Sequence, residues 1–407
     1  MLNWAKQFNI FCFLDNQQYT LQPHRYECIV GAGVKEETVT EEVRDLSALL
    51  TSGSWQLGHL SYELKDQLHG ISSEKENKIG FPLFYFFVPK VLLCIKDNNL
   101  EIIADDPGSI YNQIFFQNDT QQQVPSFIQV QSKLSKTEYI ETVKTLQQHI
   151  LLGNCYEINF CQEFFAADVQ IDPVTVYNRL ITISPNPFSA LYKWNDSWLI
   201  CASPERFLMK EGSKILSQPM KGTVRRDLLR SVNDEALKLK LQSSTKDQSE
   251  NVMVVDLVRN DLSRICKESS VQVEELFGVY SFPQVHQMIS TVSGELKNEI
   301  SFAEIISATF PMGSMTGAPK HRVMQLIDQY EPGTRGIFSG SVGYIDPNGN
   351  FDFNVVIRSI MYNAATEHLS YQAGSGITFY SDPEKEWEEC LLKAEAIKKV
   401  LTGEPAL

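Results

Sequence analysis

A long amphipathic helix is predicted by the stretch Lys246-Asp247-Gln248-Ser249-Glu250-Asn251-Val252-Met253-Val254-Val255-Asp256-Leu257-Val258-Arg259-Asn260-Asp261-Leu262. Its apolar residues recur with the helical period, at Val254, Leu257, Val258, Leu262 and Ile265. Asp247 and Glu250 extend the same stripe. A buried carboxylate needs a cationic partner, and a metal ion would supply one. The alternative is that these are first-turn acids, which the helix dipole favours without any ligand.

A second acidic helix is predicted near the C-terminus, with Ser381 or Asp382 as its N-cap. Glu386, Glu389 and Lys393 lie on one flank of it, at spacings of three and four residues. Carboxylate oxygens suit Mg²⁺, with waters and substrate completing its shell. A solvent-facing ladder of Glu and Lys is the alternative. The two acidic helices together favour a magnesium site.

A lysine is the candidate nucleophile. Lys221 lies in Gln218-Pro219-Met220-Lys221-Gly222-Thr223-Val224-Arg225-Arg226, next to a Gly-Thr turn and two guanidinium groups. Nearby positive charge and desolvation both lower the pKa of a lysine, which would leave the free amine that covalent catalysis needs. A solvated loop lysine is the alternative interpretation.

Glycines with hydroxyl neighbours recur between the two acidic helices, in segments 313–320, 340–344 and 373–376. Such segments suit anion binding, because backbone N–H groups can approach a ligand closely. Segment 313–320 is not a P-loop, because it lacks the Gly-Lys pair. Arg358, on a predicted strand over 355–362, is a natural clamp for a carboxylate, although a structural ion pair is nearly as common.

The composition excludes several classes of protein. The net charge of −14 is spread along the 407 residues without a basic stripe, so nucleic-acid binding is not expected. No apolar run reaches the roughly 20 residues of a membrane span, and no export signal is recognisable. The eight cysteines include no Cys-x-x-Cys pair, which fits a reducing compartment. We therefore expect a cytoplasmic protein that does not bind membranes.

Strands and helices are mixed along the chain, which predicts an α+β or α/β fold. Ser135 and Glu138 form a capping box before a predicted helix, and 155–165 alternates like a strand. The polar segment 117–125 reads as a linker or long loop. It divides an N-terminal region, 1–125, from a catalytic region, 126–407.

The order of these segments resembles the chorismate-utilising enzymes, and the resemblance covers about Ser132 to Val400. It implies an α+β fold in which two large, antiparallel-rich β-sheets pack together and are flanked by helices, in an α/β/β/α arrangement. Regions 1–125 and 126–407 would then form one structural domain, with segment 117–125 as a loop within it.

The resemblance also implies roles for individual residues. Lys221 would attack carbon 2 of the chorismate ring, while Glu205 would act as acid and base for the hydroxyl at carbon 4. Glu250 and Glu389 would bind Mg²⁺, with Asp247 and Glu386 in or near its shell. The other active-site positions are His286, which would orient the substrate, and the substrate contacts Ser314, Thr316, Arg358, Gly374, Gly376 and Lys393.

Within the family, Pro219-Met220-Lys221-Gly222-Thr223 is similar to the Pro-Ile-Lys-Gly-Thr of aminodeoxychorismate-forming members, whereas anthranilate-forming members carry alanine in place of Lys221. The resemblance therefore implies that chorismate and ammonia give 4-amino-4-deoxychorismate, the precursor of p-aminobenzoate and folate. Ammonia would come from a separate glutamine amidotransferase subunit, since no amidotransferase motif is recognisable here. The rivals are anthranilate synthase component I, an isochorismate-forming relative and a non-catalytic chorismate-binding paralogue.

Overall fold

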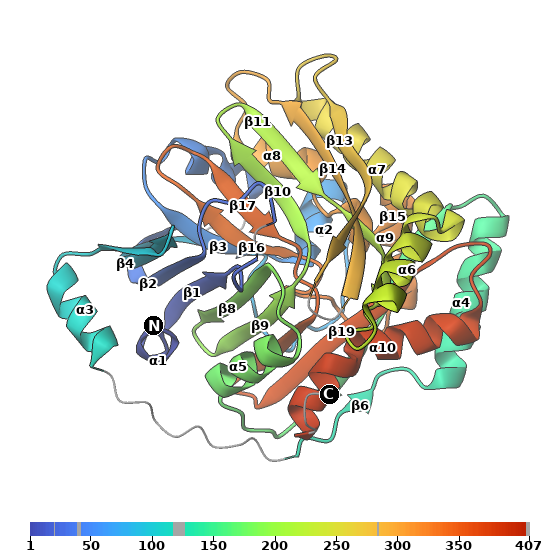
Figure 1. Cartoon of the computed structure of the whole chain (residues 1–407), viewed down its shortest axis with the longest axis horizontal. Helices are drawn as coiled ribbons and strands as arrows, with labels where there is room; N and C mark the ends of the chain where they lie inside the picture. Colours follow the sequence, from blue (N-terminus) through green and yellow to red (C-terminus); the bar gives the residue numbers. More distant parts are fainter. Residues whose placement is uncertain (20, 39–41, 117–126, 283–284, 404–407) are drawn as a thin grey trace.

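The computed structural model describes residues 1–19, 21–38, 42–116, 127–282 and 285–403. Within these ranges the strands pair antiparallel throughout and form two layers that share one long strand, β4 (Phe84–Lys96) (Figure 1). The predicted linker over 117–125 lies outside the described residues. No helix in the described ranges is long and apolar enough to cross a membrane.

The first layer extends from β4 toward the strand that carries Glu157. After β5 (Asn99–Ile103) and β4, its order is β2 (Cys28–Thr38), β1 (Ile10–Asp15), β8 (Phe188–Trp194), β9 (Ser197–Ser203), β18 (Ser359–Asn363), β19 (His368–Ile377) and β7 (Glu157–Ala166). Two short strands pair with β7, namely β6 (Gln131–Ser132) and β15 (Gly317–Ala318).

The second layer extends from β4 toward the strand that carries Lys221. Its order is β3 (Gln56–Leu60), β16 (Ser341–Ile345), β17 (Phe351–Asn354), β10 (Arg206–Glu211), β11 (Lys214–Gln218) and β14 (Val285–Glu295). Both β12 (Met220–Arg225) and β13 (Gln272–Ser281) then pair with β14.

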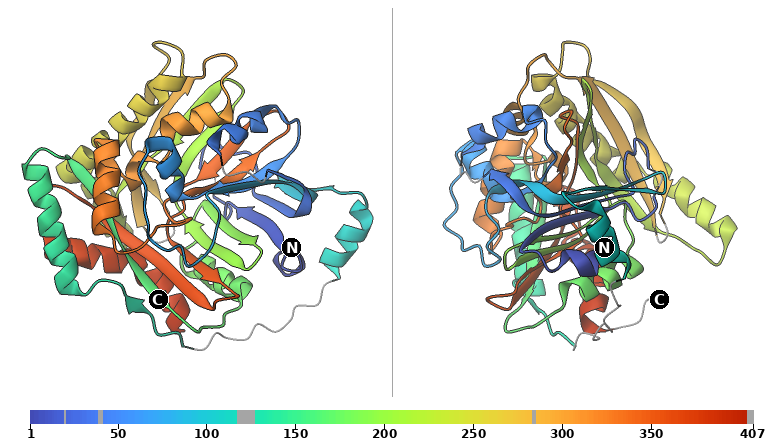
Figure 2. Two further views of the ribbon diagram at one scale, coloured as in Figure 1. Left: turned by 180° about the vertical axis from the view of Figure 1, so that it is seen from behind. Right: turned by 90° about the vertical axis from the view of Figure 1, so that its left-hand side faces the viewer.

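Side chains of the first layer alternate between two apolar cores. On β9, Leu199 and Cys201 join one core, whereas Ile200 and Ala202 join the other. The second of these cores also holds residues of α4 (Lys136–Leu151), α5 (Pro173–Ile183), α9 (Lys320–Tyr330) and α10 (Pro383–Thr402). The first core receives residues of α7 (Thr245–Ile265) and α8 (Phe302–Thr309). The predicted α/β/β/α arrangement is thereby confirmed, and Figure 2 shows its layers from two further sides.

The remaining helices are short or peripheral. They are α1 (Leu2–Ala5), α2 (Lys65–His69), α3 (Pro107–Phe115) and α6 (Ser231–Gln242), with 3₁₀ turns η1 (Val43–Thr51), η2 (Tyr62–Leu64) and η3 (Gly313–Met315). In Figure 2, α6 projects from the body of the protein.

Helices with strong capping signals begin where the sequence predicts. The Ser135 hydroxyl accepts a hydrogen bond from the backbone N–H of Glu138 at the start of α4, and the Glu138 carboxylate accepts one from the backbone N–H of Ser135, so the capping box is complete. Asp382 caps α10, with Pro383 in the first turn. Ser244 caps α7 through the backbone N–H of Asp247.

One predicted strand is wrong. Of the continuous strand expected over 355–362, only residues 359–362 lie in a strand, β18, and residues 355–358 form a break between β17 and β18. Arg358 ends the break in the left-handed region, with φ of 52°, which is unfavourable for a side chain that long. Arg358 lies outside both strands, although its carbonyl oxygen accepts a hydrogen bond from the backbone N–H of Ala202 on β9 at 3.2 Å, and apolar patterning does not encode this break.

Candidate active site

Lys221 pairs with a glutamate from the other layer. Its Nζ donates a hydrogen bond of 2.7 Å to Oε1 of Glu157, and the two side chains are 12% and 3% exposed. Burial lowers the pKa of Lys221, but the carboxylates of Glu157, Glu250 and Glu389 outweigh burial and raise it above its ordinary value. Lys221 is therefore held as an ammonium group.

The prediction that neighbouring arginines lower the pKa of Lys221 is wrong. Arg226 binds Asp234 at 2.8 Å, and Arg225 is exposed. The charges that reach the lysine come from β7, α7 and α10, which are distant in sequence. The amine that a nucleophile requires must therefore be produced by loss of a proton within the site.

Gly376 makes room for the pair between Lys221 and Glu157. A Cβ at this position would lie 2.4 Å from Oε1 of Glu157 and 2.8 Å from Nζ of Lys221. Both distances are too short for any side chain to be accepted without displacing the pair. Gly374, two residues earlier on β19, is packed against the backbone of β7, where a Cβ would lie 2.1 Å from the carbonyl oxygen of Phe160.

Glu205 lies in the turn between β9 and β10 and is 4% exposed. Burial raises its pKa to about 7, although the Ser314 hydroxyl, Lys221 and the backbone of Met220 act in the opposite direction. A carboxyl group with this pKa holds a proton near neutral pH and can give it up, as a general acid must. Two carboxylates near one lysine thus differ in environment: Glu157 is its ion-pair partner, and Glu205 is a protonatable acid.

The two predicted acidic helices meet at this site. Burial raises the pKa of Glu250 on α7, and the charges of Glu157 and Glu389 add to the increase, while Lys221 and Lys246 oppose it. Burial also acts to raise the pKa of Glu389 on α10, but Lys393, Lys246 and Lys221 bring it below its ordinary value. Glu250 and Glu389 therefore lie within electrostatic reach of each other and of Lys221, although they are far apart in sequence.

The carboxylates fit Mg²⁺ by donor type. Glu386 is 3% exposed, and among the described residues its Oε2 and that of Glu157 are buried without a hydrogen-bond partner. In the described part of the chain, no three His, Cys, Asp or Glu side chains are gathered closely enough to hold a metal. Lysines instead neutralise the acids, with Lys393 2.7 Å from Glu389 and Lys246 3.8 Å from Glu250. Asp247 packs against Gly222, beside Lys221.

Arg358 and Lys393 are linked through the backbone. Arg358 donates to the carbonyl oxygen of Lys393 at 3.0 Å, and Nζ of Lys393 donates to that of Gly374 at 2.9 Å. Arg358 forms no ion pair with any residue in the described ranges. A guanidinium group with donors left over suits a carboxylate ligand.

His286 and Thr316 have protein partners. The ring nitrogens of His286 lie 2.9 Å from Oγ of Ser281 and 3.0 Å from Oδ1 of Asp234, so the side chain, 1% exposed, ties α6 to β14. Oγ1 of Thr316 donates to the carbonyl oxygen of Met312 within its own turn. The predicted contacts of these two residues with substrate stay predictions.

Sequence reasoning missed two residues, Glu157 and Arg335. Glu157 is an acid at the start of a strand in which polar residues also occur at Asn159 and Glu163, so its charge alone did not set it apart. Arg335 follows Glu331 by four residues, a spacing typical of an ion pair. The role of each of these two residues depends on contacts with segments that are far away in the sequence.

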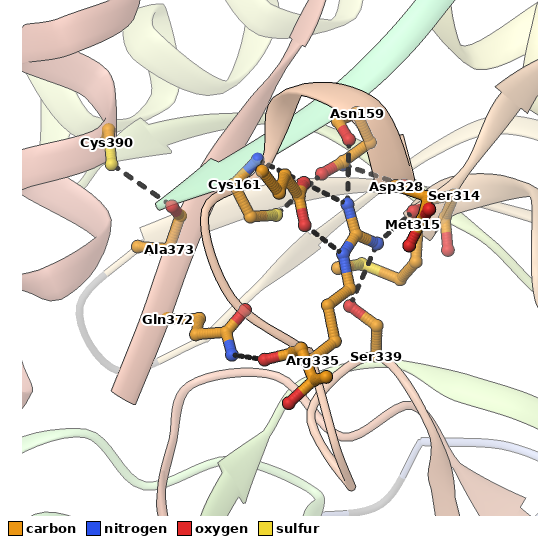
Figure 3. Close-up of polar contacts among 12 residues, drawn as sticks. Asn159, Cys161, Ser314, Met315, Asp328, Arg335, Ser339, Gln372, Ala373 and Cys390 are labelled. Carbon is orange, nitrogen blue, oxygen red and sulfur yellow. Dashed lines mark hydrogen bonds and ion pairs between the residues drawn. The ribbon is translucent and has the colours of Figure 1, made fainter. Parts of the chain in front are cut away.

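Arg335 binds backbone carbonyl groups of both η3 and β7, and we call this set of contacts the Arg335 clamp (Figure 3). Its guanidinium group pairs with Glu331 at 2.6 Å and donates to the carbonyl oxygens of Met315 and Asn159 at 2.6 and 2.9 Å. Asn159 in turn donates to the carbonyl oxygen of Ser314 at 3.0 Å. These contacts fix η3, which carries Ser314, against β7, which carries Glu157.

Replacing Arg335 with methionine is expected to lower the free energy of unfolding by about 3–5 kcal/mol, because Glu331 would be left buried without its partner. Urea denaturation measures this change. Arg259→Met is the matched control, since its pair with Asp256 is exposed and should contribute less than about 1 kcal/mol. Equal losses in the two variants would contradict the clamp.

Comparison with known proteins identifies the family of this chain. The model of the chorismate binding enzyme family matches residues 8–399. Over 270 residues the chain is 41% identical to a probable chloroplastic aminodeoxychorismate synthase of Oryza sativa subsp. japonica, covering 66% of this chain and 30% of that protein. It is 37% identical over 271 residues to aminodeoxychorismate synthase component 1 of Escherichia coli K12, covering 67% and 59%. Thus the match spans less than two thirds of either relative.

Two broader similarities extend along most of the chain. An anthranilate synthase component I-like protein of Synechocystis is 32% identical over 363 residues, covering 86% of this chain and 73% of that protein. The crystal structure of anthranilate synthase component I from Streptococcus pneumoniae TIGR4 superposes with a TM-score of 0.82 at 24% identity, covering 93% of each chain. With a family match over nearly its whole length, the chain belongs to the chorismate-binding enzymes.

Proposed function

We propose that this protein is an aminodeoxychorismate synthase component I, which converts chorismate and ammonia to 4-amino-4-deoxychorismate. The observation that carries the proposal is the buried Lys221, which pairs with the carboxylate Glu157 and lies within electrostatic reach of the acid Glu205. The similarity to aminodeoxychorismate synthases of rice and Escherichia coli supports it.

In the proposed reaction, the unprotonated Nζ of Lys221 forms a bond to carbon 2 of the ring. The ring double bonds shift, and the bond between carbon 4 and its hydroxyl breaks while Glu205 gives that oxygen a proton, so water leaves. Ammonia then adds at carbon 4, the shift runs in reverse, and Lys221 is expelled as an amine. A hydroxide is a poor leaving group, so a buried acid with a pKa of about 7 suits this step.

The substrate carries two carboxylates, which the site would hold in different ways. Arg358, Lys393 and the backbone of Gly374 and Gly376 would bind one of them, since the guanidinium group has spare donors there. Mg²⁺, when bound, would neutralise and orient the other. Glu250 and Glu389 would hold the ion, with Asp247 and Glu386 in or near its shell, which is consistent with the unpartnered oxygen of Glu386.

The amine donor is also part of the proposal. We infer that a glutamine amidotransferase subunit supplies ammonia, with ammonium salts as a substitute in vitro. The test is to incubate the purified protein with chorismate, Mg²⁺ and ammonium, and to measure the mass of the product. 4-Amino-4-deoxychorismate retains the enolpyruvyl group, whereas anthranilate lacks it, so anthranilate as the product would overturn the proposal.

Replacing Glu250 with glutamine is expected to raise the Mg²⁺ concentration for half-maximal activity by at least about tenfold, because one anionic ligand is lost. A magnesium titration of turnover measures the change. Asp256→Asn is the control, since it removes an exposed carboxylate from the same helix. A wild-type titration curve for Glu250→Gln would rule out this ligand assignment.

A further inference from the structure

We propose that Glu157 is the proton acceptor that converts the Lys221 ammonium group into the attacking amine. This inference rests on the proposed function, and it adds a residue and a step to it. Oε1 of Glu157 already accepts a hydrogen bond of 2.7 Å from Nζ of Lys221, so the proton would move along an existing contact.

The proton that Lys221 loses stays within the pair of Lys221 and Glu157. A proton passes from Nζ of Lys221 to Oε1 of Glu157, leaving a neutral amine beside a carboxylic acid. After ammonia has added to the ring and Lys221 has been expelled as an amine, the proton returns from Glu157 to Nζ. The pair ends as it began, and Glu205 regains from solvent the proton it gave to the departing hydroxyl.

Burial favours this transfer when substrate fills the site. Both side chains are nearly excluded from solvent, and separated charges are costly where water is absent. A neutral amine and acid avoid that cost. Oε2 of Glu157 has no hydrogen-bond partner among the described residues, so the hydrogen bond from Lys221 is the contact that defines this carboxylate's surroundings.

Glu205 is less suited to accept this proton. Its pKa of about 7 means that it holds a proton of its own near neutral pH, and the departing hydroxyl requires that proton. The other charged groups facing the pair are Glu250 on α7 and Glu389 on α10, with Lys246 and Lys393 beside them. Glu250 and Glu389 are the proposed ligands of Mg²⁺, which leaves Glu157 as the base.

The position of Glu157 on β7 also supports its role as the base, with Glu205 as the acid. Glu157 is the first residue of β7, two residues before Asn159, which is fixed by the Arg335 clamp and lies directly across from Gly376 on β19. The missing side chain at Gly376 leaves Oε1 and Nζ uncovered on one side. The strand therefore holds Glu157 at the lysine with little freedom, as proton transfer over a short distance requires.

The experiment compares the wild type with Glu157→Gln, which keeps the size and a hydrogen-bonding oxygen but cannot accept the proton. Protein is mixed with chorismate and Mg²⁺ without ammonia, and the covalent adduct, protein plus chorismate less one water, is followed by intact mass over time. We expect adduct formation at pH 7 to slow by about 10²- to 10⁴-fold. At pH values below the pKa of Lys221, the rate of adduct formation by Glu157→Gln should rise by about tenfold for each unit by which the pH is increased, because the proton must then be lost to solvent.

Glu163→Gln is the matched control. Glu163 lies six residues further along β7 on the same face, is 14% exposed and pairs with Lys133 at 3.7 Å, away from Lys221. Chorismate binding and urea denaturation of each variant show whether the site is still formed. If Glu157→Gln fails to fold, Glu157→Asp, which keeps the base but moves it back, should give an intermediate rate with the pH dependence of the wild type.

The possible outcomes distinguish a failure of the proposed function from a failure of the role of Glu157. A wild type that forms neither adduct nor 4-amino-4-deoxychorismate defeats the proposed function. A wild type that forms both, with a folded Glu157→Gln variant that reacts at the same rate and pH dependence, defeats only the role of Glu157. A slow variant whose rate does not rise with pH would assign Glu157 to positioning Lys221 and would also overturn proton acceptance.

Discussion

Lys221→Ala is expected to lower ammonia-dependent formation of 4-amino-4-deoxychorismate by at least about 10³-fold, because the covalent step loses its nucleophile. No adduct should appear in the intact mass when ammonia is withheld. Chorismate should still bind, since Arg358, the proposed clamp for a substrate carboxylate, is not changed. Turnover and substrate affinity are measured separately, so that loss of catalysis is distinguished from loss of the site.

Lys214→Ala provides the control for this variant. Lys214 lies on the neighbouring strand β11 and pairs with Glu274 at the surface. It should leave turnover unchanged. Removal of Lys221 also leaves Glu157 buried without its cation, so a lower free energy of unfolding is expected as well. Unchanged turnover in folded Lys221→Ala would remove the covalent mechanism.

Glu205→Gln is expected to lower turnover by about 10²- to 10⁴-fold, because the hydroxyl at carbon 4 would leave without a proton. In the proposed reaction the acid form of Glu205 is the active one. Since its pKa is about 7, kcat/KM should fall as the pH rises through 7 and level off as the pH falls below it. Loss of this alkaline limb in Glu205→Gln, with the remaining rate independent of pH there, would identify the acid.

Glu211→Gln is a suitable comparison for Glu205→Gln. Glu211 lies at the far end of β10, where its side chain is 64% exposed. Its replacement should change neither the rate nor the pH profile. An alkaline limb that persists in Glu205→Gln would instead assign the titration to another group.

The parts of the fold that depend on local signals could be predicted from the sequence. Capping residues and the spacing of apolar side chains are properties of adjacent turns, so α4, α7 and α10 begin close to the expected residues. The bend that places Arg358 at a positive φ is different, because it depends on how β17 and β18 pair with other strands. The pattern of apolar residues continues through this bend without interruption, so the pattern does not predict the bend.

The electrostatics of the site could not be predicted in the same way. The sequence places two arginines near Lys221, but Arg225 is exposed and Arg226, which follows β12, pairs with Asp234. The partner that matters, Glu157, is 64 residues away along the chain and on the other layer. Only the tertiary fold brings an acid to that lysine, and so reverses the direction of its pKa shift.

The strand shared by both layers has a mechanical consequence. From β4, one succession of paired strands leads to β7 and another leads to β12, and the two strands meet again at Glu157 and Lys221. The two layers thus diverge from β4, and the strands that carry Glu157 and Lys221 lie far from β4 in both successions. We therefore expect a change in how the two layers meet at β4 to alter the distance between Glu157, the proposed base, and Lys221, the proposed nucleophile.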